Sequence, residues 1–520
     1  MKSKRVLSLM LGLTMTAGLL AGCGSSGDSE NKETDASAGN VTTNADENGE
    51  ITNITIMIAS MGQEPVDMQK VSDAMNEITE KEIGIHADWI ISSGTTYAQQ
   101  VSMKMSSGED LDLICTQGLD FNTLLSQNQI MPLDELIDSY GQDLKTAIPE
   151  TYMDACNYQG THYLIPVVAT SAISQPIILV RSDMAQEAGW DMDRLATIKT
   201  ADDFEQLMSD VKEKYPDISI FSPLAANFGG PAISSINGLF TEDSYDALSN
   251  SMGVIASDST TVENFWASDL FKEECYRLKD WYDKGYIWTE ALTSSTTAID
   301  TYLFSGNLFS FAFSSATDVT EPFAQAQTGV FANAPTVNIP IGRVVITTTD
   351  IISHALAIPS TSQHADAAMK YLNYFYNSEE LENLLCNGIE GEHYTVDENG
   401  LVEGTENQAN YTNSFNMYFG NEQLLLNSKE NGADYYQNLI ASVSNARKSD
   451  ALGYVPDMSE LDIESVAVTN VCSEYLGGLL IGAVDVDSQL PKFLDELDSA
   501  GLQTIIDAKQ AQLNEFLTSK

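Results

Sequence analysis

The sequence Asn-Ile-Thr-Ile-Met-Ile at residues 53–58 opens the ordered part of the chain and decides its fold class. Its alternating β-branched residues predict a strand, and apolar residues at helical spacing from Met68 predict a helix. A second strand at 85–90, a second helix at 97–105 and a short buried strand at 111–115 follow. Strands that alternate with helices pair in parallel, so we expect an α/β domain with ligands beyond the carboxyl ends of its strands.

Two extended segments divide the rest of the chain. Residues 167–180 are apolar and rich in Ser and Thr, and residues 343–358 are rich in Thr. A second α/β region begins between them, with a helix that Thr200 caps. We therefore expect the chain to cross twice between two lobes, with a hinge at the crossings and a cleft that closes on a ligand.

The N-terminus carries an export signal. Three basic residues among the first five precede an apolar run at 6–20, which is too short to span a bilayer comfortably. The sequence Leu-Ala-Gly-Cys at 20–23 is similar to the lipobox of bacterial lipoproteins. That resemblance implies that Cys23 becomes the first mature residue and receives diacylglycerol, which would hold the protein on the extracytoplasmic face of the cell membrane. An ordinary secretory signal with a chance cysteine is the alternative.

The sequence predicts four parts. Residues 24–50 are almost devoid of apolar side chains, which is typical of a disordered tether. The predicted boundaries are a signal peptide at 1–22, the tether at 23–50, a first lobe from 51–168 and 350–395, and a second lobe from 169–349 and 396–520.

The charge balance limits the partners. The chain has 25 Lys and Arg residues against 75 Asp and Glu residues, for a formal net charge of −50. Such a surface repels phosphate backbones and anionic headgroups, so nucleic acid is excluded as a partner and a neutral ligand is favoured. After the first 22 residues no apolar run approaches the ~20 residues of a membrane-spanning helix, so the lipid would be the only anchor.

Cysteines and histidines give no sign of a metal or cofactor site. The five cysteines after Cys23 are far apart, which leaves one disulfide possible but describes no disulfide scaffold. The five histidines are scattered without metal-ligand spacing, and no Gly-x-Ser-x-Gly motif or phosphate loop occurs. With so many acidic residues, a carboxylate pair arises by chance, so a secreted glycoside hydrolase stays open as an alternative.

Five stretches together resemble one protein family. They are Gly-Glu-Asp-Leu-Asp-Leu-Ile at 108–114, Tyr-Gln-Gly through Ile-Pro at 158–166, Arg-Ser-Asp through Asp-Asp-Phe at 181–204, Gly-Ile-Glu-Gly-Glu-His-Tyr at 388–394, and the closing segment at 500–513. In this order and spacing, the chain resembles the extracellular solute-binding proteins of bacterial ABC importers, family 1, the relatives of maltose-binding protein. The resemblance covers nearly the whole mature chain.

The resemblance implies a two-lobed α/β fold of the type II periplasmic-binding-protein class and a lipid-anchored monomer without catalytic activity. Its function would be to capture a neutral oligosaccharide and deliver it to an ABC permease. Amides, hydroxyls and carboxylates hydrogen-bond sugar hydroxyls, and aromatic rings cover the C–H face of a sugar. The resemblance places ligand contacts on Met61, Gln63, Thr116, Gln117, Thr170, Ser171, Asn227, Phe228, Ser314, Glu390 and Tyr394.

Several features carry a plainer interpretation. Some relatives have a calcium loop after the Thr-capped helix, and residues 215–218 here do not match it, so we expect no calcium there. Trp281 is interpreted as core and Trp190 as structural, whereas Trp89 could face either core or cleft. The segment with Glu390 is also explained as a helix end followed by a turn. A peptide-binding protein on the same fold is a further alternative.

Overall fold

The computed structural model describes most of the chain after the tether. The described residues are 51–519 except 170–174, 224–238, 294–300, 316–325, 332–333, 430 and 444–445. The predicted signal peptide, tether and Cys23 lie outside them. No helix within the described residues is both long and apolar enough to cross a bilayer.

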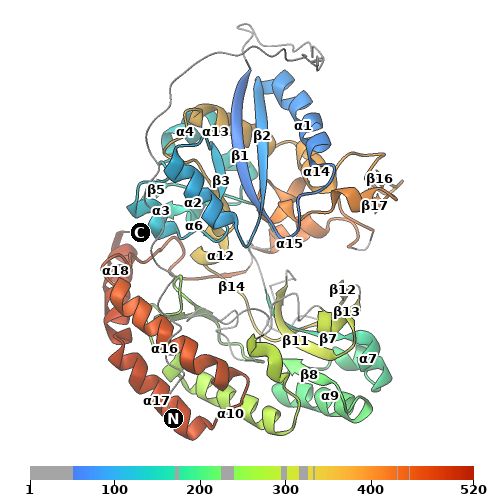
Figure 1. The fold of residues 1–520 in the computed structure, drawn as a ribbon, viewed down its shortest axis with the longest axis vertical. Helices are drawn as coiled ribbons and strands as arrows, with labels where there is room; N and C mark the ends of the chain where they lie inside the picture. The colour runs from blue at the N-terminus through green and yellow to red at the C-terminus, as the bar shows by residue number, and fades with distance from the viewer. Residues whose placement is uncertain are drawn as a thin grey trace, which may run out of the picture. The chain divides into compact units, whose positions relative to one another are not determined.

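The first sheet joins residues from distant parts of the chain (Figure 1). Its strands, in spatial order, are β2 (Ile85–Ser93), β1 (Thr52–Ser60), β3 (Leu113–Cys115), β15 (Ala355–Ala357) and β6 (Ile165–Pro166). β1 runs parallel to both β2 and β3, whereas β15 is antiparallel to β3 and β6. The parallel pairing that the strand–helix alternation predicts is therefore confirmed.

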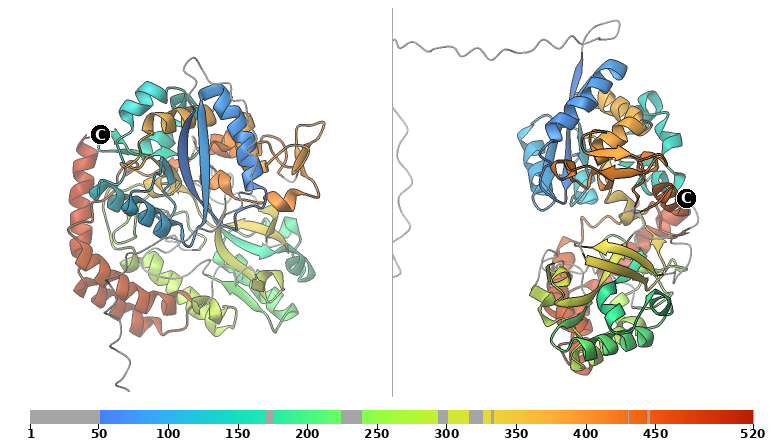
Figure 2. Two further views of the ribbon diagram at one scale, coloured as in Figure 1. Left: turned by 45° about the horizontal axis from the view of Figure 1, so that its top comes forward. Right: turned by 90° about the vertical axis from the view of Figure 1, so that its right-hand side faces the viewer.

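Helices pack on this sheet through one apolar face each. In α1 (Met68–Ile83), the side chains of Met68, Val71 and Met75 are buried at helical spacing, and the helix ends at Gly84 in the left-handed conformation. Figures 1 and 2 show the other helices around the same sheet. They are α2 (Tyr97–Ser107), α3 (Phe121–Ser126), α4 (Asp134–Tyr140), α5 (Leu144–Ala147), α6 (Glu150–Ala155), α13 (Ala365–Phe375), α14 (Glu379–Asn387) and α15 (Tyr435–Val443).

The second sheet has its own apolar core. Its strands, in spatial order, are β12 (Gln327–Phe331), β13 (Ala334–Pro340), β7 (Gln175–Arg181), β11 (Leu308–Ser315) and β8 (Ser219–Ser222). β7 is antiparallel to β11 and β13, and β11 is parallel to β8. The helices of this core are α7 (Ser182–Glu187), α8 (Met192–Leu195), α9 (Ala201–Lys214), α10 (Asp269–Asp283), α16 (Asp462–Leu480), α17 (Val486–Ser499) and α18 (Leu502–Ser519).

The two segments interpreted as a hinge lie side by side. Near the first core, the Val167 N–H donates to the His354 carbonyl at 2.9 Å. Near the second core, two residues before the segment 343–358 begins, the Ile341 N–H donates to the Pro176 carbonyl at 3.0 Å. Within the described residues a further segment also passes between the cores: β18 (Arg447–Lys448) pairs in parallel with β14 (Val345–Ile346). The chain therefore passes between the cores a third time, which the predicted lobe boundary between residues 395 and 396 implies, although the two extended segments alone predicted two crossings.

Two expectations about chain organisation differ from the structure. Residues 343–358 are not extended throughout, because Thr347 and Asp350 form a capping box that starts α12 (Thr348–Ile352). The domain boundaries stay a prediction, but the segment 396–520 does not pack as one unit. Tyr411 and Phe419 belong to the core of the first sheet, whereas Leu476 and the later helices belong to the second core.

A buried carboxyl group helps to hold the start of the first crossing, the segment 167–180, against the first core. Glu382 in α14 accepts the Asn421 N–H at 2.9 Å, and the neighbouring Gly420 and Glu422 hydrogen-bond the backbone of Val168. Burial raises the pKa of Glu382 to about 8, and nearby Glu422 adds to this rise. The fold therefore favours the protonated form of Glu382.

A buried ammonium group holds the second core. The Lys509 Nζ on α18 donates to the Leu248 carbonyl at 2.9 Å, to Asn250 Oδ1 at 2.7 Å and to the Gly253 carbonyl at 3.3 Å. Three acceptors match the three N–H groups of the protonated amine, although burial lowers its pKa to about 7. Leu248 has a positive φ of 44°, so Lys509 stabilises a loop that is unfavourable by itself.

We expect Glu382→Gln to change the pH dependence of stability. The folded-state pKa is above the unfolded value of ~4.3, so the stabilising contribution of Glu382 is full below pH ~4.3. It is lost as pH rises through the folded pKa of about 8. The free energy of unfolding of the wild type should therefore fall relative to the variant by up to ~1.4 kcal/mol per pH unit. Urea unfolding across this range measures the difference, and parallel profiles would contradict the assignment.

We expect Lys509→Ala to lower the free energy of unfolding by about 3 kcal/mol, because three buried acceptors lose their donor and a cavity opens. Chemical denaturation measures this loss. Lys492→Ala is the matched control, since Lys492 is exposed on the neighbouring helix α17. Equal stability losses in the two variants would show that the buried hydrogen bonds of Lys509 are not needed.

Candidate functional site

The carboxyl ends of β1, β2 and β3 meet at one edge of the first sheet. The Gly94 N–H donates to the Ser60 carbonyl at 2.8 Å, and the Ala59 N–H donates to the Cys115 Sγ at 3.3 Å, so the strand ends are joined. The loops that follow carry Met61, which is 71% exposed, the exposed Gln63 and the half-buried Gln117. The structure thus brings together three of the predicted ligand residues at one edge.

Thr116 lies at the same edge but serves the fold. Its hydroxyl donates to the Ile352 carbonyl at 2.6 Å and accepts the Ala355 N–H at 3.0 Å. Only 3% of the residue is exposed. The hydroxyl joins β3 to β15, and its predicted role in ligand binding stays a prediction.

The segment from Gly388 to Tyr394 docks beside α1. Gly388 ends α14 with a positive φ of 85°, which confirms the helix-end interpretation of this segment. The His393 Nε2 donates to Asp67 Oδ2 at 3.1 Å, which places the segment next to the loop that carries Met61 and Gln63. Within this segment Glu390 is exposed and Tyr394 is buried.

Asp67, Glu392 and His393 are close enough together to suggest a metal site, because one ligand atom from each lies within 4.8 Å of the others. The hydrogen bonds argue against that use. The Ile389 N–H donates to His393 Nδ1 at 2.9 Å, so the ring proton lies on Nε2 and no lone pair faces the carboxylates. Metal-binding histidines instead donate from their second ring nitrogen. Lys70 also pairs with Glu392. This cluster fits a structural clamp and does not fit a metal site.

The predicted residues of the second lobe are only partly described. Thr170, Ser171, Asn227 and Phe228 lie outside the described residues. Ser314 is in β11, opposite Pro176 of β7, but its side chain is not described. Because β8 and β11 are parallel, Ser314 and the carboxyl end of β8 at Ser222 lie toward the same edge of the second sheet.

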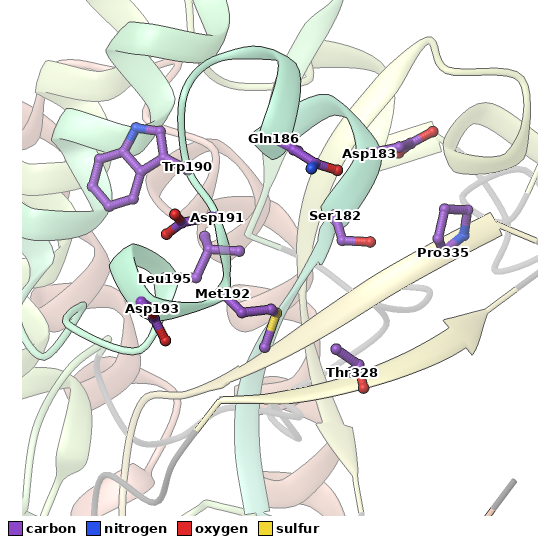
Figure 3. Close-up of a pocket in the computed structure, with 10 residues that line it drawn as sticks. All are labelled: Ser182, Asp183, Gln186, Trp190, Asp191, Met192, Asp193, Leu195, Thr328 and Pro335. Carbon is purple, nitrogen blue, oxygen red and sulfur yellow. The ribbon is translucent and has the colours of Figure 1, made fainter.

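A surface pocket of about 520 Å³ lies at the other edge of the second sheet, where β7 ends. Figure 3 shows Met192 facing the strands that carry Thr328 and Pro335. Two of the three acidic residues that line the pocket, Asp183 and Asp191, have structural partners. Asp183 receives two hydrogen bonds from Arg181, and Asp191 caps α8. This pocket is therefore separate from the predicted site.

The tryptophans do not form a sugar-binding platform. Trp190, Trp266, Trp281 and Trp288 are all buried in the second core, which confirms the core interpretation of Trp281 and the structural interpretation of Trp190. Trp89 is half-buried in β2 and packs edge-to-face on Phe419, with ring centroids 4.9 Å apart.

His354 is a residue that sequence reasoning passed over. It directly precedes β15 and lies next to the backbone groups that hold Thr116. Spacing alone could not reveal it, because its surroundings come from Tyr418 and Asp350 in other elements. The available signal was its position near the end of the extended segment 343–358, the return crossing through which the chain comes back to the first core.

Comparisons with known proteins agree with this architecture. The family described as bacterial extracellular solute-binding protein matches residues 65–382, more than half of the chain. A family described as a domain of unknown function matches residues 450–518, which contain α16, α17 and α18. A carbohydrate ABC transporter substrate-binding protein from Streptococcus pneumoniae serotype 4 is 24% identical over 480 residues, covering 89% of this chain and 91% of that protein.

Solved structures show the same fold. The N-glycan transport solute-binding protein NgtS from Streptococcus pneumoniae has a TM-score of 0.76 at 21% identity, over 90% of this chain and 99% of its own. The same protein in complex with Man1GlcNAc has a TM-score of 0.71 at 21% identity, over 89% and 99% of the two chains. The S. pneumoniae substrate-binding protein FusA in complex with kestose has a TM-score of 0.61 at 16% identity, over 90% and 100%.

The two-lobed α/β fold and the family resemblance are thereby confirmed, and the chain belongs to the bacterial extracellular solute-binding protein family.

Proposed function

We propose that this protein is the substrate-binding component of an ABC importer for a neutral oligosaccharide. The observation that carries the proposal is the likeness, across 89% and 90% of the chain, to solute-binding proteins whose solved structures hold Man1GlcNAc and kestose, respectively. The curated relative is also named for carbohydrate transport. A net charge of −50 favours an uncharged ligand over an anionic one.

The carboxyl edge of the first sheet supplies suitable chemistry for a sugar. Gln63 and Gln117 offer amide donors and acceptors, and Met61 offers exposed apolar surface. We propose that these residues face the ligand from the first lobe. Thr170, Ser171, Asn227, Phe228 and Ser314 would contribute from the crossing and the second lobe, with Glu390 and Tyr394 at the rim.

Binding would act through a shift between lobe arrangements. A ligand that contacts both lobes binds the closed arrangement more tightly, so it raises the closed population without any chemical step. The permease would recognise that closed form. Lipid attachment at Cys23 would keep the binding protein near the permease on the outer face of the membrane.

A thermal-shift screen of the purified mature protein tests the proposal, because a ligand that binds only the folded state raises its stability. The panel contains Man1GlcNAc, Man5GlcNAc, kestose and tripeptides. We expect a concentration-dependent rise in the melting temperature with at least one oligosaccharide and none with peptides. A rise with peptides alone would overturn the carbohydrate assignment, and release of shorter sugars from the ligand would instead indicate a glycoside hydrolase.

We expect Gln117→Ala to weaken binding of the oligosaccharide found in that screen by about five- to tenfold. The reason is the loss of one hydrogen-bonding amide, worth about 1 kcal/mol. Gln503→Ala is the matched control, since Gln503 is exposed on α18 and its amide donates to Asp507 on the same helix. Isothermal titration calorimetry measures both, and equal affinities in the two variants would remove Gln117 from the site.

A further inference from the structure

We propose that His354 is a specificity-determining residue that accepts a hydrogen bond from a ligand hydroxyl through its Nε2. This inference rests on the proposed function and adds a contact at the end of the return crossing. It also predicts which ligands the site accepts, because a nitrogen with only a lone pair binds donors and rejects carbonyl oxygens.

The position of His354 is fixed by the first sheet. His354 directly precedes β15, which pairs antiparallel with β3. Its carbonyl accepts the Val167 N–H, so the residue joins the two crossing segments. The hydroxyl of Thr116 bonds the backbone on both sides of it, at Ile352 and at Ala355. The backbone of His354 therefore lies at the carboxyl end of β3, beside the loop that carries Gln117.

Hydrogen bonds determine which ring nitrogen carries the proton. The His354 Nδ1 lies 3.2 Å from the Asp350 carbonyl, which can only accept, so Nδ1 holds the hydrogen. The Ser353 Oγ lies 3.0 Å from Nδ1 and gives its own hydrogen to the Asp350 carbonyl at 3.1 Å, so it too can only accept from Nδ1. Nε2 consequently presents a lone pair, and no hydrogen-bond partner for it occurs among the described residues.

The surroundings keep the ring neutral. Burial lowers the pKa of His354, although the bond to the Asp350 carbonyl opposes this effect. The Tyr418 ring stacks on the imidazole at a centroid distance of 6.5 Å and an angle of 18°. The groups that face it are the Tyr418 phenol and the backbone of α12. The Asp350 carboxyl accepts hydrogen bonds from Thr347, and burial raises its pKa to about 6, so it titrates within the same pH range. By contrast, a ring nitrogen lies within 3.1 Å of a carboxylate oxygen in each of His86, His162 and His393.

A neutral acceptor at this place matches a sugar hydroxyl. Protonation would convert Nε2 from an acceptor to a donor and remove the bond to the ligand. Because the pKa of His354 is lowered, the acceptor form persists at neutral pH and is lost only as the pH falls below the ordinary histidine range. Ligand affinity should therefore fall on acidification, and bound ligand should lower the pKa further.

The test is calorimetric titration of the full mature protein with Man5GlcNAc and kestose between pH 5 and pH 8. His354→Asn keeps an N–H near the Asp350 carbonyl but has no acceptor at the Nε2 position, so we expect the dissociation constant to rise about tenfold. His354→Gln places an amide oxygen near that position, and we expect it to restore most of the affinity. Both variants should lose the acid-dependent weakening. His364→Asn, at the start of α13, is the matched control.

The outcomes separate the two proposals. If the wild type binds neither probe, the proposed oligosaccharide function and this inference both fail. If the wild type binds while His354→Asn keeps its affinity and its pH profile, the role of His354 alone is overturned. Equal loss in the Asn and Gln variants, with a matching drop in urea stability, would assign His354 to the fold and overturn its role as an acceptor.

Discussion

The insertion of β15 between β3 and β6 is the constraint on which the first lobe depends. Residues 355–357 follow the passage of the chain through the second core and complete a sheet whose first strand begins at Thr52. The Thr116 hydroxyl holds their entry point. Since backbone groups inside a sheet must be paired, β6 would lose its neighbour without this return.

The same insertion brings the crossings together. β15 directly follows His354, whose carbonyl receives the Val167 N–H, and β14 pairs with β18 a few residues earlier. The crossings are also anchored by buried polar groups in each core. Glu382 holds the residues that pair with Val168, and Asp246 accepts the Ser449 hydroxyl at 2.6 Å next to β18. Buried polar groups need such partners, so these contacts restrict where the chain can pass between the cores.

His354 and His393 differ in which ring nitrogen carries the proton, although the sequence around them gives no sign of this difference. In His393, Nδ1 accepts a hydrogen bond from a backbone N–H, so the proton is on Nε2, which donates to Asp67. Nε2 is then not available as a ligand atom in the apparent metal cluster. In His354, Nδ1 donates its hydrogen to a backbone carbonyl, so Nε2 has the lone pair and is an acceptor. Opposite roles thus follow from one backbone contact each. Neither contact can be read from residue spacing.

The sequence by itself determined the α/β class, the first three strands and their parallel pairing, and the paired segments at 167–180 and 343–358, because alternating and helical periodicities are local properties. It also indicated most of the edge that carries Met61, Gln63 and Gln117. The capping box of Thr347 and Asp350, which starts α12, is also a local pattern that the sequence contains. Only the tertiary structure decided that Tyr411 and Phe419 pack in the first core and that Thr116 serves the backbone. These two outcomes depend on partners hundreds of residues away, and local pattern carries no record of such partners.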